Sequence, residues 1–227
     1  MTREIFAAFA FACVVSHTAA AGEVSGKITI GKSISARNLV PAVYGLRGMA
    51  IQETSTQDQK TSEFERIAVW LEPDKPLEPA APAVAIMEQR DRRFEPALLI
   101  LPIGSTVEFP NTDPIFHNIF SLSRTQSFDL GYYPKGQSRK VRFARPGVVQ
   151  VYCHIHSSMH AVIVVVSSPW FGKPDRNGDF SWPVVPPGNY QLVVWQKTLG
   201  LLRRKIVVPE NAPLRLNITL PHEDLEN

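Results

Sequence analysis

The sequence is a succession of short segments rich in β-branched residues, separated by turn residues, and this pattern restricts the fold more than any other feature. Prolines (19) and glycines (13) are frequent and the valine-rich runs are short, which favours strands over helices. Turn signals separate the segments at about the spacing of a β-sandwich. The strand candidates in the first part of the chain are 24–30, 66–72, 83–89, 96–102, 105–111, 116–122, 138–144, 147–153 and 160–166. We therefore predict an all-β chain.

The composition changes after Val166, and this change divides the chain. Asn177-Gly178 is a strong signal for a hairpin turn, and a Pro-Pro-Gly run at 186–188 begins another strand. Further strand candidates follow at 189–195, 203–208 and 214–220. The predicted parts are a signal peptide (1–21), N-terminal strands with a wrapping connection (22–83), a β-sandwich (84–166), a smaller β-sandwich module (167–221) and a tail (222–227).

The C-terminal module carries a short resemblance of its own. "DRNGDF" followed by "PPGNY" is similar to the D-x-N-G-x-F and P-P-G-x-Y patterns of transthyretin-like, carboxypeptidase-regulatory modules. "VSGKI" from residue 24 resembles the opening strand of such modules, which implies that the two domains can share a strand. A calcium loop through Asp175, Asn177 and Asp179 is the alternative to the hairpin turn, but the bidentate glutamate and flanking helices of an EF-hand are absent from the sequence.

The first residues are expected to be an export signal rather than part of the folded protein. Arg3 precedes an apolar run at 5–15 that is too short to span a bilayer, and the small residues after it suit cleavage after Ala21. No later stretch is long and apolar enough to be transmembrane, so we expect a periplasmic or secreted protein. Cleavage removes Cys13 and leaves Cys153 as the one cysteine, so an intramolecular disulfide is impossible.

Residues 153–160, "CHIHSSMH", contain a cysteine, three histidines and a methionine, all of which can bind a soft or borderline metal. Structural zinc prefers paired cysteines, haem attachment needs C-x-x-C-H, and iron–sulfur clusters need more cysteines. Copper accepts thiolate, imidazole and thioether together. The sequence therefore predicts a copper ion as the cofactor.

The spacing selects the ligands. Cys153, His156 and Met159 lie three residues apart on a loop between two valine-rich segments. A sheet that fixes both ends of this loop can direct the three side chains to one point. His117, which follows the strand candidate at 105–111, is the fourth candidate. Two imidazoles, a thiolate and a distant thioether form the His₂Cys site with a weak axial methionine that is typical of blue copper.

These residues carry a resemblance to a known family. "GSTVEFPNTDPIFHNIF" followed by "GVVQVYCHIHSSMHAVIVVV" is similar to the cupredoxins, in particular to plastocyanin-like and amicyanin-like domains with a short C-x₂-H-x₂-M loop. The resemblance covers about residues 84–166. It implies a cupredoxin-like Greek-key β-sandwich, which here precedes the smaller transthyretin-like module.

The resemblance also implies a role for each matched residue. Cys153 would provide a short covalent bond to copper, and His117 and His156 would complete a trigonal set. Met159 would be the long axial ligand, and His156 would lie near the surface as the electron port. Asn118 would hydrogen-bond across to the ligand loop and tune the cysteine sulfur. The structural alternatives are a buried inert thiol, a hydrogen-bonded loop histidine, a core methionine and a turn asparagine.

His154 and His160 are expected to point elsewhere. Side chains alternate along a strand, so Val151 and Cys153 share one face, whereas Tyr152 and His154 share the other. His160 begins the next strand. The alternative is that these two histidines form a weak surface copper site that helps loading.

The function that fits these observations is single-electron transfer by an exported type 1 copper protein that meets a redox partner protein. The alternative is a periplasmic copper carrier or sensor without an electron-transfer role. Catalysis is disfavoured, because Tyr152 stands where a multicopper oxidase has a histidine and six histidines are too few for a second copper cluster. A net charge of +3 without a long basic run does not indicate nucleic acid. As a further hypothesis, the C-terminal module docks the copper domain on a partner, unless it is purely structural.

Overall fold

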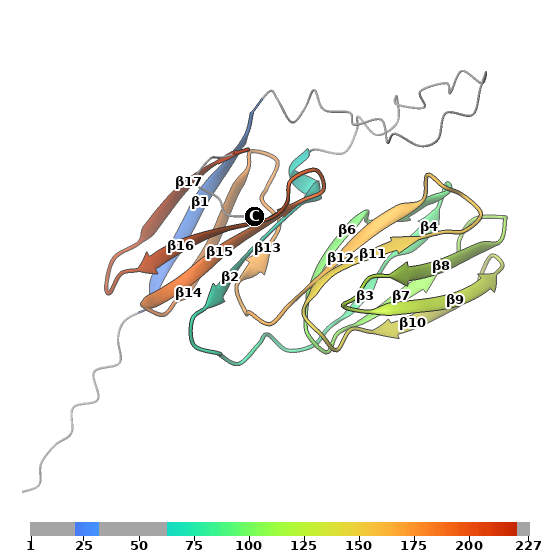
Figure 1. Ribbon diagram of the computed structural model, residues 1–227, viewed down its shortest axis with the longest axis horizontal. Helices are drawn as coiled ribbons and strands as arrows, with labels where there is room; N and C mark the ends of the chain where they lie inside the picture. Colours follow the sequence, from blue (N-terminus) through green and yellow to red (C-terminus); the bar gives the residue numbers. More distant parts are fainter. Residues whose placement is uncertain (1–20, 32–62, 222–227) are drawn as a thin grey trace, which may run out of the picture.

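The computed structural model describes residues 21–31 and 63–221. Nearly all of the predicted signal peptide, most of the predicted wrapping connection and the tail lie outside these residues. In the described residues the regular structure consists of strands, apart from one 3-10 helix, η2 (Glu63–Arg66), which confirms the all-β prediction (Figure 1). Within the same residues, no helix has the length and apolar character needed to cross a bilayer.

Two sheets form the first sandwich (Figure 1). One has the strand order β6-β12-β11-β8-β9 and the other has the order β10-β7-β3. A two-stranded hairpin, β4–β5, is joined to the end of β7 by a bridge between Gln89 and Asn111. The strands are β3 (Val84–Ile86), β4 (Glu88–Arg90), β5 (Arg93–Glu95), β6 (Leu98–Pro102), β7 (Thr106–Pro110), β8 (His117–Leu122), β9 (Ser127–Tyr133), β10 (Ser138–Arg142), β11 (Gly147–Tyr152) and β12 (His160–Val166).

The second sandwich is built from both ends of the chain. Its sheets have the orders β14-β1-β17 and β13-β2-β15-β16. The strands are β1 (Gly22–Ile30), β2 (Ile67–Pro73), β13 (Phe171–Gly172), β14 (Asp179–Val185), β15 (Gly188–Gln196), β16 (Gly200–Val208) and β17 (Leu214–Leu220). Thus β1 and β2, which the division of the sequence places in an N-terminal segment, supply inner strands of the sheets that residues 167–221 complete.

The turn at Asn177-Gly178 is present, but the predicted hairpin is wrong. Gly178 has a φ of 85°, and the carboxylate of Asp175 accepts hydrogen bonds from the backbone of Asn177 and Asp179. The strands on the two sides belong to different sheets, because β13 pairs with β2 and β14 pairs with β1. The turn therefore carries the chain from one sheet of the second sandwich to the other.

The strands between the two sandwiches are buried on both faces. In β2, Ile67, Val69 and Leu71 face the core of the second sandwich, whereas Ala68 and Trp70 face the first sandwich. β12 and β15 alternate in the same way, which explains why their sequences are continuous apolar runs. The cluster between the sandwiches consists of Ala68, Trp70, Leu98, Val162, Val164, Val166, Val193 and Trp195.

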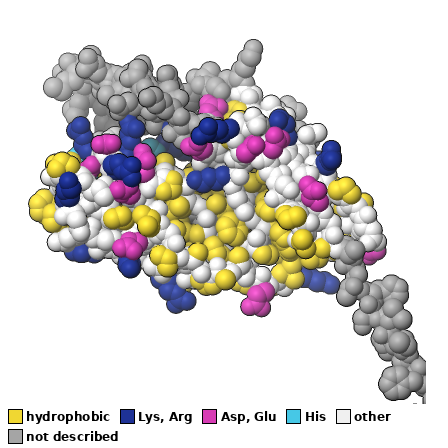
Figure 2. Space-filling view, turned by 180° about the vertical axis from the view of Figure 1, so that it is seen from behind, with side chains coloured by type: hydrophobic (Ala, Val, Ile, Leu, Met, Phe, Trp, Pro, Cys, Tyr) yellow, Lys and Arg dark blue, Asp and Glu magenta, His cyan; other side chains and the backbone are white. Residues whose placement is uncertain are grey.

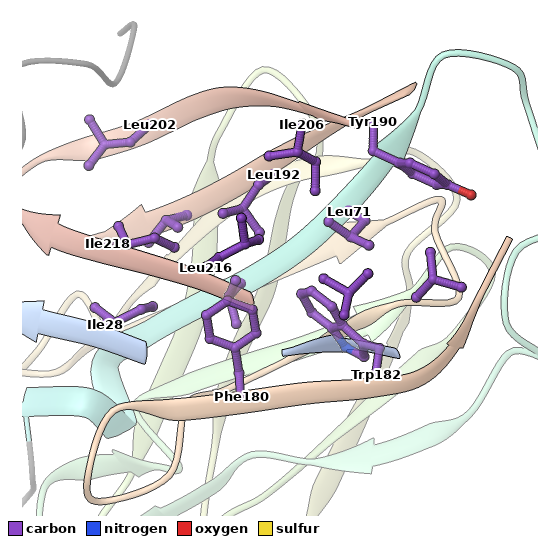
Figure 3. Close-up of a cluster of buried hydrophobic side chains, with 14 of the residues drawn as sticks. Ile28, Leu71, Phe180, Trp182, Tyr190, Leu192, Leu202, Ile206, Leu216 and Ile218 are labelled. Carbon is purple, nitrogen blue, oxygen red and sulfur yellow. The ribbon is translucent and has the colours of Figure 1, made fainter. Parts of the chain in front are cut away.

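Each sandwich also has its own core. Figure 3 shows that of the second sandwich, where Phe180 and Trp182 from one sheet meet Leu71 and Leu192 from the other. On the face of the molecule seen in Figure 2, hydrophobic side chains gather over the middle, and charged side chains of both signs lie around them. The core of the first sandwich includes Cys153 and Met159, so the two sulfur-bearing side chains of the ligand loop belong to a packed interior.

Candidate metal centre

Three donor atoms converge at one end of the first sandwich. Sγ of Cys153 lies 4.0 Å from Nδ1 of His117 and 3.9 Å from Nδ1 of His156, and the two nitrogens are 3.1 Å apart. Among the described residues, this is the group of histidine, cysteine and acidic side chains compact enough to hold a metal ion. The structure therefore brings together three of the four predicted ligands from two segments of the chain.

The ligand loop is held at both ends by the sheet. β11 ends at Tyr152 and β12 begins at His160, and these two residues are paired across the strands. Within the loop, the amide of Cys153 donates to the carbonyl of Met159, and the amide of Met159 donates to the carbonyl of His156. The positions of the three predicted loop ligands are thus linked by the backbone.

Met159, the predicted ligand outside the group of three donor atoms, is buried. Its side chain is 1% exposed and packs in the same cluster as Cys153. A buried methionine next to a valine-rich strand also fills core volume, so its burial fits both axial ligation and packing. Ligation by Met159 stays a prediction.

Burial differs between the two histidines. The imidazole of His117 is fully buried, whereas His156 is partly exposed. An exposed apolar side chain precedes each histidine in sequence: Phe116 precedes His117, and Ile155 precedes His156. Burial, followed by the influence of His117 and the positive charge of Arg92, lowers the pKa of His156. This favours the neutral imidazole, which is the form that binds metals.

The sequence did not point to Asp113, which contacts His117. Oδ2 of Asp113 lies 2.7 Å from Nε2 of His117, on the side of the ring away from Cys153. Asp113 is itself buried, and it accepts hydrogen bonds from the backbone of Asp91 and Arg92 at the tip of the β4–β5 hairpin. The available signal in the sequence was the position of Asp113, four residues before His117. Aspartates are common in loops, so this position alone does not indicate a contact with the histidine.

Asn118 makes a different hydrogen bond from the one that the family resemblance implies. Its amide nitrogen donates to Oδ1 of Asp129 in β9 at 2.7 Å, rather than to the ligand loop. A carboxylate is a stronger acceptor than a loop carbonyl or a sulfur atom, which accounts for this choice. The amide oxygen of Asn118 is buried and has no hydrogen-bond partner among the described residues.

His154 and His160 lie apart from the three donor atoms. The ring of His154 stacks on Phe120, with centroids 3.8 Å apart, and its Nε2 lies 3.7 Å from Asp129. The two ring nitrogens of His160 face the carbonyl of Ser158 and the ammonium of Lys197 in the second sandwich. Both residues therefore have contacts that account for them without a metal at the loop.

The three donor atoms fit copper. Bonds of about 2.0 Å to imidazole nitrogen and about 2.3 Å to thiolate sulfur are typical of a divalent ion of this size. Separations of 3.1, 3.9 and 4.0 Å allow one ion to reach all three atoms at those lengths. One thiolate and two imidazoles with a nearby thioether are the donor set of a type 1 copper site. Zinc sites with one cysteine and no further cysteine or carboxylate ligand are uncommon.

Comparisons with known proteins give partial likenesses. No protein-family model matches the chain, and no curated protein matches it. A copper-containing nitrite reductase from Thermus scotoductus SA-01 is 24% identical with a TM-score of 0.36, over 40% of this chain and 25% of the reductase. A purple cupredoxin from Nitrosopumilus maritimus is 23% identical with a TM-score of 0.34, over 36% of this chain and 99% of that protein. A reduced amicyanin variant is 18% identical with a TM-score of 0.35, over 43% of this chain and 98% of the amicyanin.

Proposed function

We propose that this chain is an exported type 1 copper protein that transfers single electrons. The observation that carries the proposal is the convergence of Sγ of Cys153 with Nδ1 of His117 and of His156. Copper bound there would supply one-electron cycling between Cu(I) and Cu(II). Met159 is the proposed axial ligand, and one copper ion per chain is expected. No other cofactor is proposed.

The protein contributes a rigid, dry site. Cys153, His117 and Met159 are buried in a packed core, and the loop is tied by its own backbone hydrogen bonds. Ligands that keep their positions in both oxidation states reduce the rearrangement that accompanies electron transfer. His156 is the one of the three donor residues that reaches the surface, so it is the proposed route for the electron to and from a redox partner protein.

The proposal includes export. Removal of residues 1–21 as a signal peptide would place the protein in the periplasm or outside the cell, where Cys153 is protected from oxidation by burial and by ligation. Mass spectrometry of the protein recovered from a secreting host would show whether the mature chain begins at Gly22. The C-terminal module is proposed to have the transthyretin-like fold indicated by its turn motifs.

Optical and electron-spin-resonance spectra of the copper-loaded mature protein test the proposal. We expect the intense visible absorption of thiolate-to-copper charge transfer and its complete loss in Cys153→Ala. The matched control is His154→Ala, which removes a neighbouring imidazole that faces Asp129 and should leave the spectrum unchanged. A colourless copper-loaded protein would exclude a type 1 site.

Voltammetry separates electron transfer from copper carriage. A reversible couple, together with slow loss of copper to a chelator, is expected of the electron carrier. Tight Cu(I) binding with fast exchange and no reversible couple would instead indicate a carrier or sensor. The two additional histidines, His154 and His160, suggest that alternative, but their rings contact Phe120 and Lys197 rather than the three donor atoms.

A further inference from the structure

The tip of the β4–β5 hairpin has an unusual backbone. Asp91 and Arg92 have φ angles of 52° and 56°, in the left-handed region that non-glycine residues seldom adopt. Two-residue hairpin turns of this kind normally contain Asn-Gly or a similar pair, because both central residues need positive φ. A bulky arginine in this conformation costs free energy, and such a cost persists where the surrounding structure fixes the backbone.

The carboxylate of Asp113 is what fixes this turn. Oδ1 accepts from the amide of Asp91 at 2.6 Å, and Oδ2 accepts from the amide of Arg92 at 2.8 Å. The amide of Asp113 in turn donates to the side chain of Asn111, which is fully buried and bonds to the backbone of Ile115 and Tyr133. Asp113 is thus held from both sides, by the hairpin tip and by the loop that leads to His117.

This geometry determines the tautomer of His117. An ionised carboxylate can only accept hydrogen bonds, so the contact of 2.7 Å between Oδ2 of Asp113 and Nε2 of His117 requires the proton on Nε2. Nδ1 then carries a lone pair directed at Cys153 and His156. The geometry supports the ionised state, because each of the two carboxylate oxygens accepts a hydrogen bond from a backbone amide, one from Asp91 and one from Arg92.

We propose that Asp113, clamped by the tip of the β4–β5 hairpin, is a positioning residue that presets His117 as a metal ligand through the hydrogen bond to Nε2. The inference rests on the proposed copper site and adds to it a residue and a hairpin. A carboxylate bonded to a ligand histidine fixes the ring orientation and increases its basicity as a ligand. The clamp therefore favours Cu(II) over Cu(I) and lowers the reduction potential.

The first test uses the metal-free protein, so it does not depend on copper binding. Nitrogen-15 NMR of the histidine side chains distinguishes the two neutral tautomers and imidazolium. We expect Nε2 of His117 in the wild-type protein to carry a proton, because it faces the carboxylate of Asp113, and this proton to exchange slowly with water. A ring whose proton lies on Nδ1 and not on Nε2 would overturn the proposal without any variant having to fold.

The second test uses Asp113→Asn with Asp129→Asn as its control. An asparagine at 113 must turn its NH₂ group toward one of the hairpin amides. Asp129 is the matched position because its carboxylate accepts from Asn118 and lies near His154. We expect Asp113→Asn to weaken Cu(II) binding by about 10-fold to 100-fold and to raise the reduction potential. Asp129→Asn should stay within about threefold of the wild type.

Equal Cu(II) affinity and potential in wild type and Asp113→Asn would overturn the positioning role. Failure of the wild type to bind copper would instead overturn the proposed function, and the NMR result on the metal-free protein would still decide whether Asp113 fixes the tautomer. Arg92→Gly adds a variant that keeps the backbone amide and suits positive φ. It should preserve the Nε2–H tautomer, and loss of that tautomer would contradict the clamp.

Discussion

The amide of Cys153 donates a hydrogen bond to the carbonyl oxygen of Met159 at a distance of 3.3 Å, so the first and last ligand candidates of the loop are tied to each other by the backbone. The pairing of Tyr152 with His160 holds the strands immediately outside them. Because these contacts are made by backbone atoms, they do not depend on the ligand side chains, and changes to those side chains can be read as changes in ligation rather than in loop structure.

Met159→Leu tests whether Met159 binds the metal or only fills the core. Leucine has nearly the volume of methionine, so the loss in the free energy of unfolding should stay below about 1.5 kcal/mol. Removal of the thioether takes away a donor that stabilises Cu(II), and we expect a higher reduction potential with the strong visible absorption retained. Voltammetry and an optical spectrum measure both. An unchanged potential would mean that Met159 fills the core and does not ligate.

The number of copper ions per chain tests the part played by the other histidines. The double variant His154→Ala, His160→Ala removes both of the neighbouring imidazoles that lie apart from the three donor atoms. We expect one equivalent of tightly bound copper in the variant and in the wild type, measured by metal analysis after gel filtration. Binding of two equivalents by the wild type and one by the variant would reveal a second site.

The strand pattern and the ligand spacing were the parts of the molecule that the sequence could predict. Most strand candidates coincide with strands, because apolar alternation is a local property that survives in any sandwich. The C-x₂-H-x₂-M spacing predicted that Cys153 and His156 face one point, and the structure places their donor atoms 3.9 Å apart. Alternation likewise predicted the outward direction of His154, which stacks on Phe120.

Contacts between distant segments were not predictable. In "DRR" at 91–93 only Asp91 is of a type enriched at positive φ, and nothing local indicates that Arg92 adopts it. The carboxylate of Asp113, which accepts both amides, stabilises the turn. The resemblance of "VSGKI" to the opening strand of transthyretin-like, carboxypeptidase-regulatory modules suggested that β1 joins the C-terminal part, but its parallel pairing with β17 cannot be deduced from the segment alone. In both cases the partner, rather than the segment itself, determines the structure.

The pH dependence of the metal-free protein follows from His156. Its pKa in the folded state lies below the ordinary value of 6.5. The unfolded chain therefore takes up a proton first as the pH falls. The stabilising contribution is complete above about pH 6.5 and is lost as the pH falls toward the lowered pKa. Urea unfolding of the metal-free protein between pH 7.5 and about pH 5 should show this decline, and NMR titration should give a pKa of His156 below 6.5.

Arg92→Gln identifies one cause of this shift. The variant removes a positive charge near His156 and keeps the backbone amide that Asp113 accepts, so the pKa of His156 should rise toward 6.5. The matched control is Arg145→Gln, because Arg145 precedes β11 whereas the ligand loop follows its other end. A pKa that moves in neither variant would assign the shift to burial and His117 alone. An equal rise in both variants would mean that net positive charge, rather than the position of Arg92, lowers the pKa.

The cluster between the sandwiches makes the strongest prediction about stability. Trp195, from β15, is 7% exposed and packs in this cluster with Val162 and Val164 of β12, the strand that follows the ligand loop. Trp195→Ala should lower the free energy of unfolding by about 3 kcal/mol or more, measured by urea denaturation. Val207→Ala is the control: it shortens a side chain that is 66% exposed and should change stability by less than about 0.5 kcal/mol.

The same cluster predicts what removal of the C-terminal module would do. Deletion of residues 167–227 removes β13 and β15, the two strands that pair with β2. It also exposes Val162, Val164 and Val166 on the outer face of β12. We therefore expect the truncated chain to aggregate or unfold, and the intact protein to unfold in one cooperative transition. A truncated chain that stays monomeric and keeps its copper spectrum would show that the two sandwiches are independent, and it would make docking on a partner the better role for the module.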